Sequence, residues 1–94
     1  MKIAGVIWLD EIIEKIRQKH QVTQDEVKEV LRSSNHFRFV EKGHRPGENV
    51  YLAFGQTNAG RYLTIFFVHK KNHQALILSA RDMTIAERKR YEQK

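Results

Sequence analysis

The first third of the chain combines apolar and charged residues with the period of a helix. Apolar side chains recur at intervals of three and four over residues 10–19, and they form the stripe Leu9, Ile12, Ile13 and Ile16. Thr23 and Glu26 have the spacing of a capping box, with Val22 and Val27 at the positions of a hydrophobic staple. The pattern predicts two consecutive N-terminal helices, each with one buried side.

After residue 36 the chain has the pattern of strands. Four segments alternate apolar and polar residues or are rich in strand-forming residues: 37–40, 50–54, 62–69 and 75–80. Short loops separate the last three, and such connections join antiparallel strands. Residues 1–7 are a candidate for one further short strand. We therefore expect an α+β fold in which the two helices pack on an antiparallel meander of four to five strands.

A second capping box, Thr84 and Glu87, predicts a short charged helix near the C-terminus. The strand over residues 62–68 is apolar on both sides, so both faces of the sheet need to be covered. The two N-terminal helices can cover one face, and the last helix offers few apolar side chains for the other. We expect this helix to cover the second face incompletely and a partner protein to complete its burial.

The length and the charge of the chain limit the number of domains and the class of binding partner. Ninety-four residues suit one small domain spanning residues 1–94. The first 35 residues carry six basic and six acidic groups, whereas residues 36–94 carry eleven basic and five acidic groups. The net charge of +6 and the pI of about 9.8 therefore arise in the later part of the chain. This favours an anionic partner such as nucleic acid, and a solvated basic surface is the alternative interpretation.

Several classes of site are excluded. The absence of cysteine rules out disulfides, thiolate metal sites and a cysteine nucleophile. No serine lies in a nucleophile elbow, and no glycine pattern is typical of a phosphate-binding loop. His69 and His73 have a metal-type spacing, but they lie at a hairpin turn beside Lys70 and Lys71, whose charges repel a cation. We expect no metal site and no cofactor.

The N-terminal segment has no features of a signal peptide, and the longest apolar stretch, residues 65–68, is far too short to span a bilayer. The expected location is the cytoplasm.

The remaining candidate chemistry is a cluster of basic residues near the C-terminus. Arg81 lies at the end of the last predicted strand, and Arg88 and Tyr91 share one side of the following helix. Guanidinium groups can stabilise the charge that develops on a phosphate during RNA cleavage. A tyrosine, lysine or histidine can exchange the protons, and His20 is the best imidazole candidate for the base. The competing interpretation is a solvated helix face with a packing tyrosine.

The order of these motifs resembles the BrnT family of ribonuclease toxins. The resemblance covers nearly the whole chain, and its most specific part is the run Ser79-Ala80-Arg81-Asp82-Met83-Thr84 followed by Glu87, Arg88 and Tyr91. The earlier matching residues are Trp8, Asp10, Lys19, His20, Glu26, Gly60 and Arg61. Gln21 stands where the family usually has glycine.

The resemblance implies a RelE/ParE-like fold and a toxin of a type II toxin–antitoxin pair that cleaves RNA without a metal ion. It implies a cognate antitoxin as partner and operator DNA bound only through the toxin–antitoxin complex. By position, it assigns Arg81 and Arg88 to the RNA or its scissile phosphate, and His20 and Tyr91 to proton transfer. Lys19 and Arg61 become RNA-binding candidates. Arg45 joins them because it lies in a polar loop, residues 42–49, that could cover a binding face.

Two other functions share the same basic surface. One is a non-catalytic module that binds an antitoxin and, with it, operator DNA. The other is a ParE-like inhibitor of DNA gyrase. A sheet that binds RNA through stacked aromatic residues is less favoured, because Phe66 and Phe67 point to opposite faces.

Overall fold

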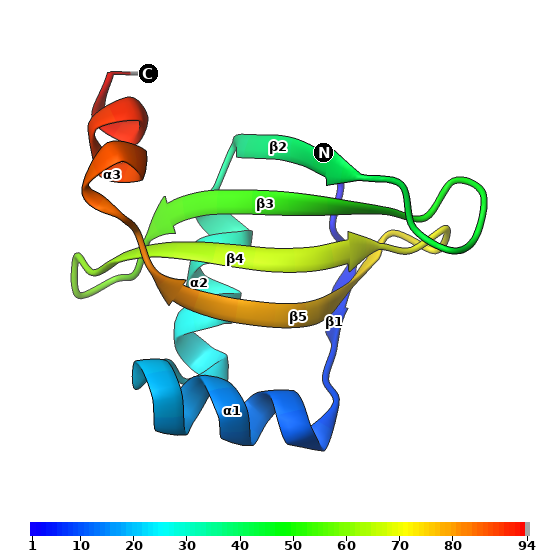
Figure 1. The fold of residues 1–94 in the computed structure, drawn as a ribbon, viewed down its shortest axis with the longest axis horizontal. Helices are drawn as coiled ribbons and strands as arrows, with labels where there is room; N and C mark the ends of the chain where they lie inside the picture. The colour runs from blue at the N-terminus through cyan, green and yellow to red at the C-terminus, as the bar shows by residue number, and fades with distance from the viewer. Residues whose placement is uncertain (94) are drawn as a thin grey trace.

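The computed structural model describes residues 1–93 and consists of one five-stranded sheet with three helices (Figure 1). The strands are β1 (Gly5–Ile7), β2 (His36–Glu41), β3 (Asn49–Gln56), β4 (Tyr62–His69) and β5 (Gln74–Asp82). The helices are α1 (Asp10–His20), α2 (Gln24–Ser33) and α3 (Ile85–Glu92). The predicted α+β class, with two helices before the sheet and one after it, is confirmed.

The strand order in the sheet is β1-β5-β4-β3-β2. Strands β2 to β5 form the predicted antiparallel meander, with β2 and β1 at the two edges. The prediction of an antiparallel sheet is wrong for β1, which pairs parallel with β5. The reason is the connection: α1 and α2 separate β1 from the meander, and no hairpin forces the direction of β1.

The two N-terminal helices begin where the sequence predicts. In α2, the Thr23 hydroxyl accepts a hydrogen bond from the Glu26 backbone N–H, and the Glu26 side chain accepts one from the Thr23 backbone N–H. The same box forms at Thr84 and Glu87 of α3. Helix α1 ends at Gln21, which has a φ of 53° in the left-handed region. The tight turn into α2 is therefore made by a glutamine, which adopts this backbone conformation less readily than glycine.

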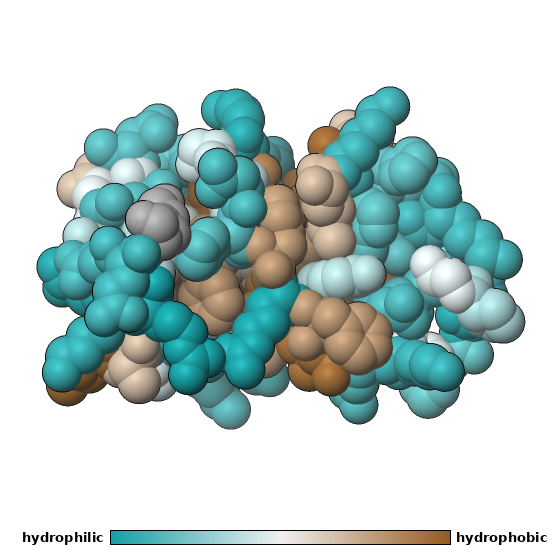
Figure 2. Space-filling model, turned by 90° about the horizontal axis from the view of Figure 1, so that it is seen from above, coloured by the Kyte–Doolittle hydropathy of each residue, from teal (hydrophilic) through white to brown (hydrophobic). Residues whose placement is uncertain are grey.

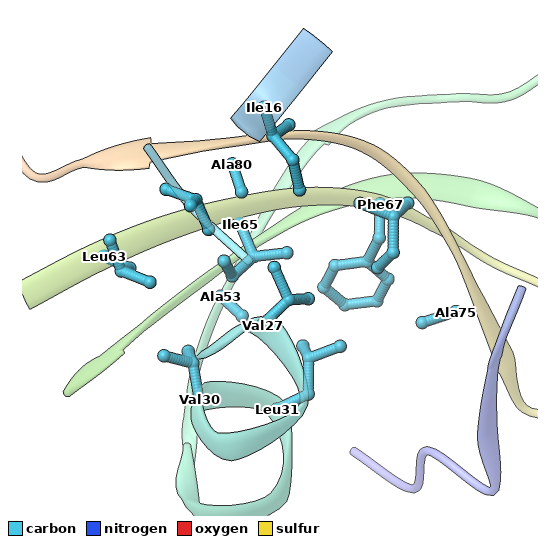
Figure 3. Packing of buried hydrophobic residues seen from close by; sticks show 12 residues of the cluster. Ile16, Val27, Val30, Leu31, Ala53, Leu63, Ile65, Phe67, Ala75 and Ala80 are labelled. Atoms are coloured by element: carbon cyan, nitrogen blue, oxygen red, sulfur yellow. The ribbon is translucent and has the colours of Figure 1, made fainter. Parts of the chain in front are cut away.

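The core lies between the sheet and the two N-terminal helices (Figure 3). Alternate residues of β4, namely Leu63, Ile65 and Phe67, are fully buried on this face. The two helices and the turn between them contribute a matching set of buried side chains: Ile16, Val22, Val27, Val30 and Leu31. Burial of these groups is the main source of stability for a chain of this size.

The opposite face of the sheet is covered only in part, and we call it the open face. Its apolar side chains are buried or partly buried: Val50, Leu52, Phe54, Phe66, Val68, Leu76 and Leu78. Helix α3 lies at one end of this face and contains no buried residue. From above, apolar side chains gather between the hydrophilic region of the C-terminal end and that of the opposite end (Figure 2).

The expectation that α3 leaves this face partly uncovered is confirmed, while the partner that completes its burial stays a prediction.

Among residues 1–93 no helix is both long and apolar enough to cross a membrane.

Candidate functional site

Arg61, in the loop between β3 and β4, binds together four parts of the chain. Its guanidinium group donates to the Asp82 carboxylate at 2.8 and 3.2 Å and to the carbonyl oxygens of His20 and Gln21, each at 2.6 Å. A weaker bond of 3.3 Å reaches Glu26. These contacts occupy all five N–H donors of the group. Arg61 therefore joins the end of α1, the start of α2 and the end of β5 to the start of β4.

The electrostatics of this cluster follow from the same bonds. The hydrogen bonds from Arg61 hold the pKa of Asp82 below its ordinary value, and the charges of Arg61 and His20 act in the same direction. In return, Asp82 raises the pKa of Arg61. His20, the predicted base, therefore lies with Asp82 and Arg61 on the helix side of the sheet, whereas Arg81, next in sequence to Asp82, faces the other side.

Arg81 lies on the open face. Its guanidinium group forms a bidentate pair with Glu87, at 2.7 and 2.9 Å, and donates to its neighbour's carbonyl oxygen, that of Asp82, at 3.0 Å. Its central carbon lies 5.3 Å from the centre of the Phe66 ring. Among residues 1–93, these three bonds leave two of the five N–H donors available for another acceptor. Unlike Arg61, Arg81 is both held in place and able to bind an anion.

Glu87 fixes the position of Arg81. Besides the arginine, its carboxylate accepts hydrogen bonds from the Thr84 backbone N–H at 2.9 Å and the Thr64 hydroxyl at 3.0 Å. The bonds from Arg81 are the largest cause that lowers the pKa of Glu87 from 4.5 to about 2. The carboxylate is therefore ionised throughout the physiological range and keeps the Arg81 side chain oriented.

Arg88 and Tyr91 meet at the ring of Tyr62. The Arg88 guanidinium carbon lies 4.0 Å above the centre of that ring, within the range of a cation–π contact. Tyr91 lies edge-on to the same ring, with ring centres 6.0 Å apart. Arg88 also makes a long ion pair of 3.6 Å with Glu92. Arg88 and Arg81 thus have separate partners, although both lie where α3 meets the sheet.

The other two predicted residues lie apart from this group. Lys19 is exposed in the last turn of α1. Arg45 lies in the loop between β2 and β3, at the opposite end of the strands from α3 (Figure 1). The buried carboxylate of Glu48 binds Lys70 at 2.9 Å and so ties this loop to the β4–β5 hairpin. The structure therefore does not bring Arg45 to the remaining candidates.

Three side chains near α3 were not predicted from the sequence: His36, Arg38 and Arg90. They line a cavity of about 370 Å³ together with Glu87 and Tyr91. His36 and Arg38 are two residues apart in β2 and therefore share a face of the sheet. This spacing can be recognised in the sequence. Their meeting with α3 depends on the fold.

The predicted absence of a metal site was based on His69 and His73. Their ring centres are 5.5 Å apart, and His69 Nε2 lies 2.8 Å from the carbonyl oxygen of Lys2. Within residues 1–93 no three histidine, aspartate or glutamate side chains are grouped as ligands for a metal ion.

Comparison with known families gives a match over most of the chain. The model of a family described as ribonuclease toxin, BrnT, of type II toxin–antitoxin system matches residues 8–87. The matched segment includes the helices α1 and α2, all strands from β2 to β5 and the residues Arg61, Arg81 and Glu87. Comparison with curated proteins gave no match.

Proposed function

The chain belongs to the BrnT family of ribonuclease toxins of type II toxin–antitoxin systems, and from this premise we propose that it cleaves RNA without a metal ion where β5 meets α3. The family implies RNA as the substrate and an antitoxin as the partner. The observation that carries the proposal is Arg81, which Glu87 holds in place while two of its N–H donors stay available.

The reaction has three chemical requirements. Attack of the ribose 2′-oxygen on phosphorus needs a base to take the hydroxyl proton. Negative charge that grows on the phosphate oxygens needs fixed cations, and the departing 5′-oxygen needs an acid. The bond from phosphorus to the 5′-oxygen breaks as the bond to the 2′-oxygen forms, which leaves a cyclic phosphate and a free 5′-hydroxyl.

Arg81 and Arg88 are assigned to the phosphate. Arg81 is oriented by a bidentate ion pair, and Arg88 is oriented by the Tyr62 ring, so little reorganisation is needed when the charge develops. His20 and Tyr91 are assigned to proton transfer, with Lys19 as a further cation beside His20. Arg61 is assigned a positioning role, because its donors are occupied within the protein. Arg45 would contact only a distant part of a longer RNA.

A pair of neighbouring substitutions on α3 tests the assignment. Arg88→Gln and Lys89→Gln each remove one exposed positive charge. We expect Arg88→Gln to slow cleavage of an RNA substrate by about a hundredfold, as for loss of one donor to a developing oxyanion, and Lys89→Gln to change it little. Both variants should melt at nearly the wild-type temperature. Equal activity of the two variants would remove Arg88 from the reaction.

Addition of a chelator tests metal independence separately. The wild-type protein should cleave RNA at the same rate in excess EDTA as in magnesium, and RNA that stays intact only in EDTA would contradict this part of the proposal.

For the antitoxin, we propose binding over the open face. The support is the apolar surface that α3 leaves uncovered, together with Val40 of the edge strand β2, which is 42% exposed. Sedimentation of the isolated protein with a hydrophobic dye tests for this surface. A monomer that does not bind the dye would count against it.

We also propose that operator DNA is bound only by the toxin–antitoxin complex. The basic excess of residues 36–94 is compatible with a supporting role in that complex. A promoter fragment should be shifted by the purified pair and not by the toxin alone.

A further inference from the structure

The cavity between β2, β3 and α3 has the composition of a site for a flat, anionic ligand. Its volume of about 370 Å³ falls within the range of about 300–1,000 Å³ typical of small-ligand sites. Six of the side chains that line it determine its chemistry: His36, Arg38, Phe54, Glu87, Arg90 and Tyr91. We call it the α3 pocket.

The aromatic wall of the α3 pocket is fixed in place. The His36 ring lies edge-on to Tyr91, with ring centres 5.6 Å apart and planes at 89°, and edge-on to Phe54 at 6.4 Å. Ser34 secures the backbone below the ring, since its hydroxyl accepts from the His36 backbone N–H and donates to the Phe54 carbonyl oxygen. Because the ring is already held in place, stacking a base on it costs little further side-chain conformational entropy.

The charge of the pocket is positive. Glu87 is already paired with Arg81 by two short hydrogen bonds. Arg38 and Arg90 are exposed, and within residues 1–93 neither guanidinium group has a hydrogen-bond or ion-pair partner. They contrast with Arg61, whose donors are all occupied. The pocket therefore offers two fixed positions from which uncommitted arginines can bind phosphate oxygens.

We propose that the α3 pocket binds one unpaired nucleotide of the RNA substrate, with its base against the His36 and Tyr91 rings and its phosphate between Arg38 and Arg90. The proposal rests on the proposed ribonuclease function and names the substrate class, single-stranded RNA, because only an unpaired base can enter a pocket and stack on aromatic rings. His36, Arg38 and Arg90 become binding residues beside the cleavage site rather than part of a solvated surface.

The test is binding of a fluorescent oligoribonucleotide with 2′-O-methyl riboses, which cannot be cleaved. Arg90→Gln and Lys89→Gln remove neighbouring charges of the same helix, but only Arg90 lines the pocket. We expect Arg90→Gln, and likewise Arg38→Gln, to weaken binding about tenfold, and Lys89→Gln to change it less than about twofold, as expected for an exposed charge that contacts no phosphate. Equal losses in the Lys89 and Arg90 variants would mean a diffuse charge effect and would overturn the proposal.

The stacking part has its own test at His36. His36→Ala removes the ring, whereas His36→Phe keeps a ring without nitrogen atoms. Binding should fall about tenfold in the alanine variant, in line with the loss of one stacked base, and stay close to wild type in the phenylalanine variant. The same RNA annealed into a duplex should bind more weakly than the single strand. Loss of binding in both variants, with melting temperatures unchanged, would contradict stacking.

These experiments distinguish a failure of the pocket proposal from a failure of the ribonuclease proposal on which it rests. Failure of the wild-type protein to cleave any RNA, with pocket-dependent binding intact, would overturn the ribonuclease proposal alone. Cleavage at a normal rate and with normal substrate affinity in the Arg38 and Arg90 variants would overturn the pocket alone. If these variants lose affinity for the antitoxin and keep it for RNA, the pocket is a protein-binding site and the proposal is wrong.

Discussion

The two faces of the sheet are built from alternate residues of the same strands, yet they serve different purposes. On the helix side, Ile65 and Phe67 have no exposed surface and pack against Ile16 and Val27 (Figure 3). On the open face, their neighbour Phe66 stays half-buried beneath the Arg81 guanidinium group. The comparison shows that one face supplies the stability, which leaves the other free to keep incompletely paired charges.

The arginines follow the same division. Arg61 lies toward the helix side and uses every donor to join α1, α2 and β5. Within residues 1–93, Arg81 on the open face has two donors without a bond, and the guanidinium groups of the exposed Arg38 and Arg90 have no bonds at all. A guanidinium group whose five N–H donors are all bonded within the protein cannot also bind a phosphate. The number of unbonded donors therefore distinguishes a structural arginine from one that can bind RNA.

The largest expected difference between the faces is in stability. Ile65→Ala removes a fully buried side chain and leaves a cavity, so we expect it to lower the free energy of unfolding by about 3 kcal/mol. Phe66→Ala, one residue away on the open face, should cost only about 1 kcal/mol because part of that ring is already in water. Urea unfolding of both variants measures this, and equal costs would mean that the open face is part of the core.

The next effect is the acid dependence of the open face. Because Glu87 has a pKa of about 2 in the folded protein and 4.5 ordinarily, its ion pair contributes fully above pH 4.5. This contribution is lost as the pH falls from about 4.5 to about 2, and we expect the loss to be about 3 kcal/mol.

Glu87→Gln should remove most of this acid dependence, measured by thermal unfolding between pH 2 and pH 6. Glu11→Gln, at an exposed position in the first turn of α1, is the matched control and should keep the wild-type slope. An unchanged slope in the Glu87 variant would contradict the assigned ion pair.

The Arg61 cluster should respond to a smaller change. In Arg61→Lys the charge remains, but an ammonium group has three donors and cannot reproduce five hydrogen bonds. We expect a loss of about 1.5 kcal/mol in the free energy of unfolding. Arg17→Lys, in an exposed pair with Glu14, should change it by less than about 0.5 kcal/mol. Matching values in chemical denaturation would mean that the Arg61 bonds add nothing beyond charge.

The smallest effect is a gain. Gln21 has a φ of 53°, a conformation that costs an ordinary residue more than glycine. Gln21→Gly should raise the free energy of unfolding by about 0.5 kcal/mol, although it loses a 3.1 Å hydrogen bond to the Gln18 carbonyl oxygen. Gln18→Gly, inside the same helix, should lower it by about 1 kcal/mol. A loss in both variants would show that the turn is not strained by Gln21.

Features that depend on neighbours within four residues follow from the amino-acid sequence alone. The two capping boxes, the apolar stripe of α1 and the hairpin-connected strands all form where they were predicted, because hydrogen bonds and side-chain periodicity at this range are set by local residue types. The residue types and spacing of the motif around Arg81 and Arg88 also indicate the family without reference to the fold.

Contacts between segments that are distant in the sequence arise only in the folded protein. Three such features are the parallel pairing of β1 with β5, the hydrogen bonds from Arg61 to carbonyl groups 40 and 41 residues away, and the contact of His36 with Tyr91. Such contacts are long-range, and no local pattern encodes which donors a partner will occupy. The residue type determines how many hydrogen bonds a guanidinium group can donate. The fold determines how many of those donors remain available for a ligand.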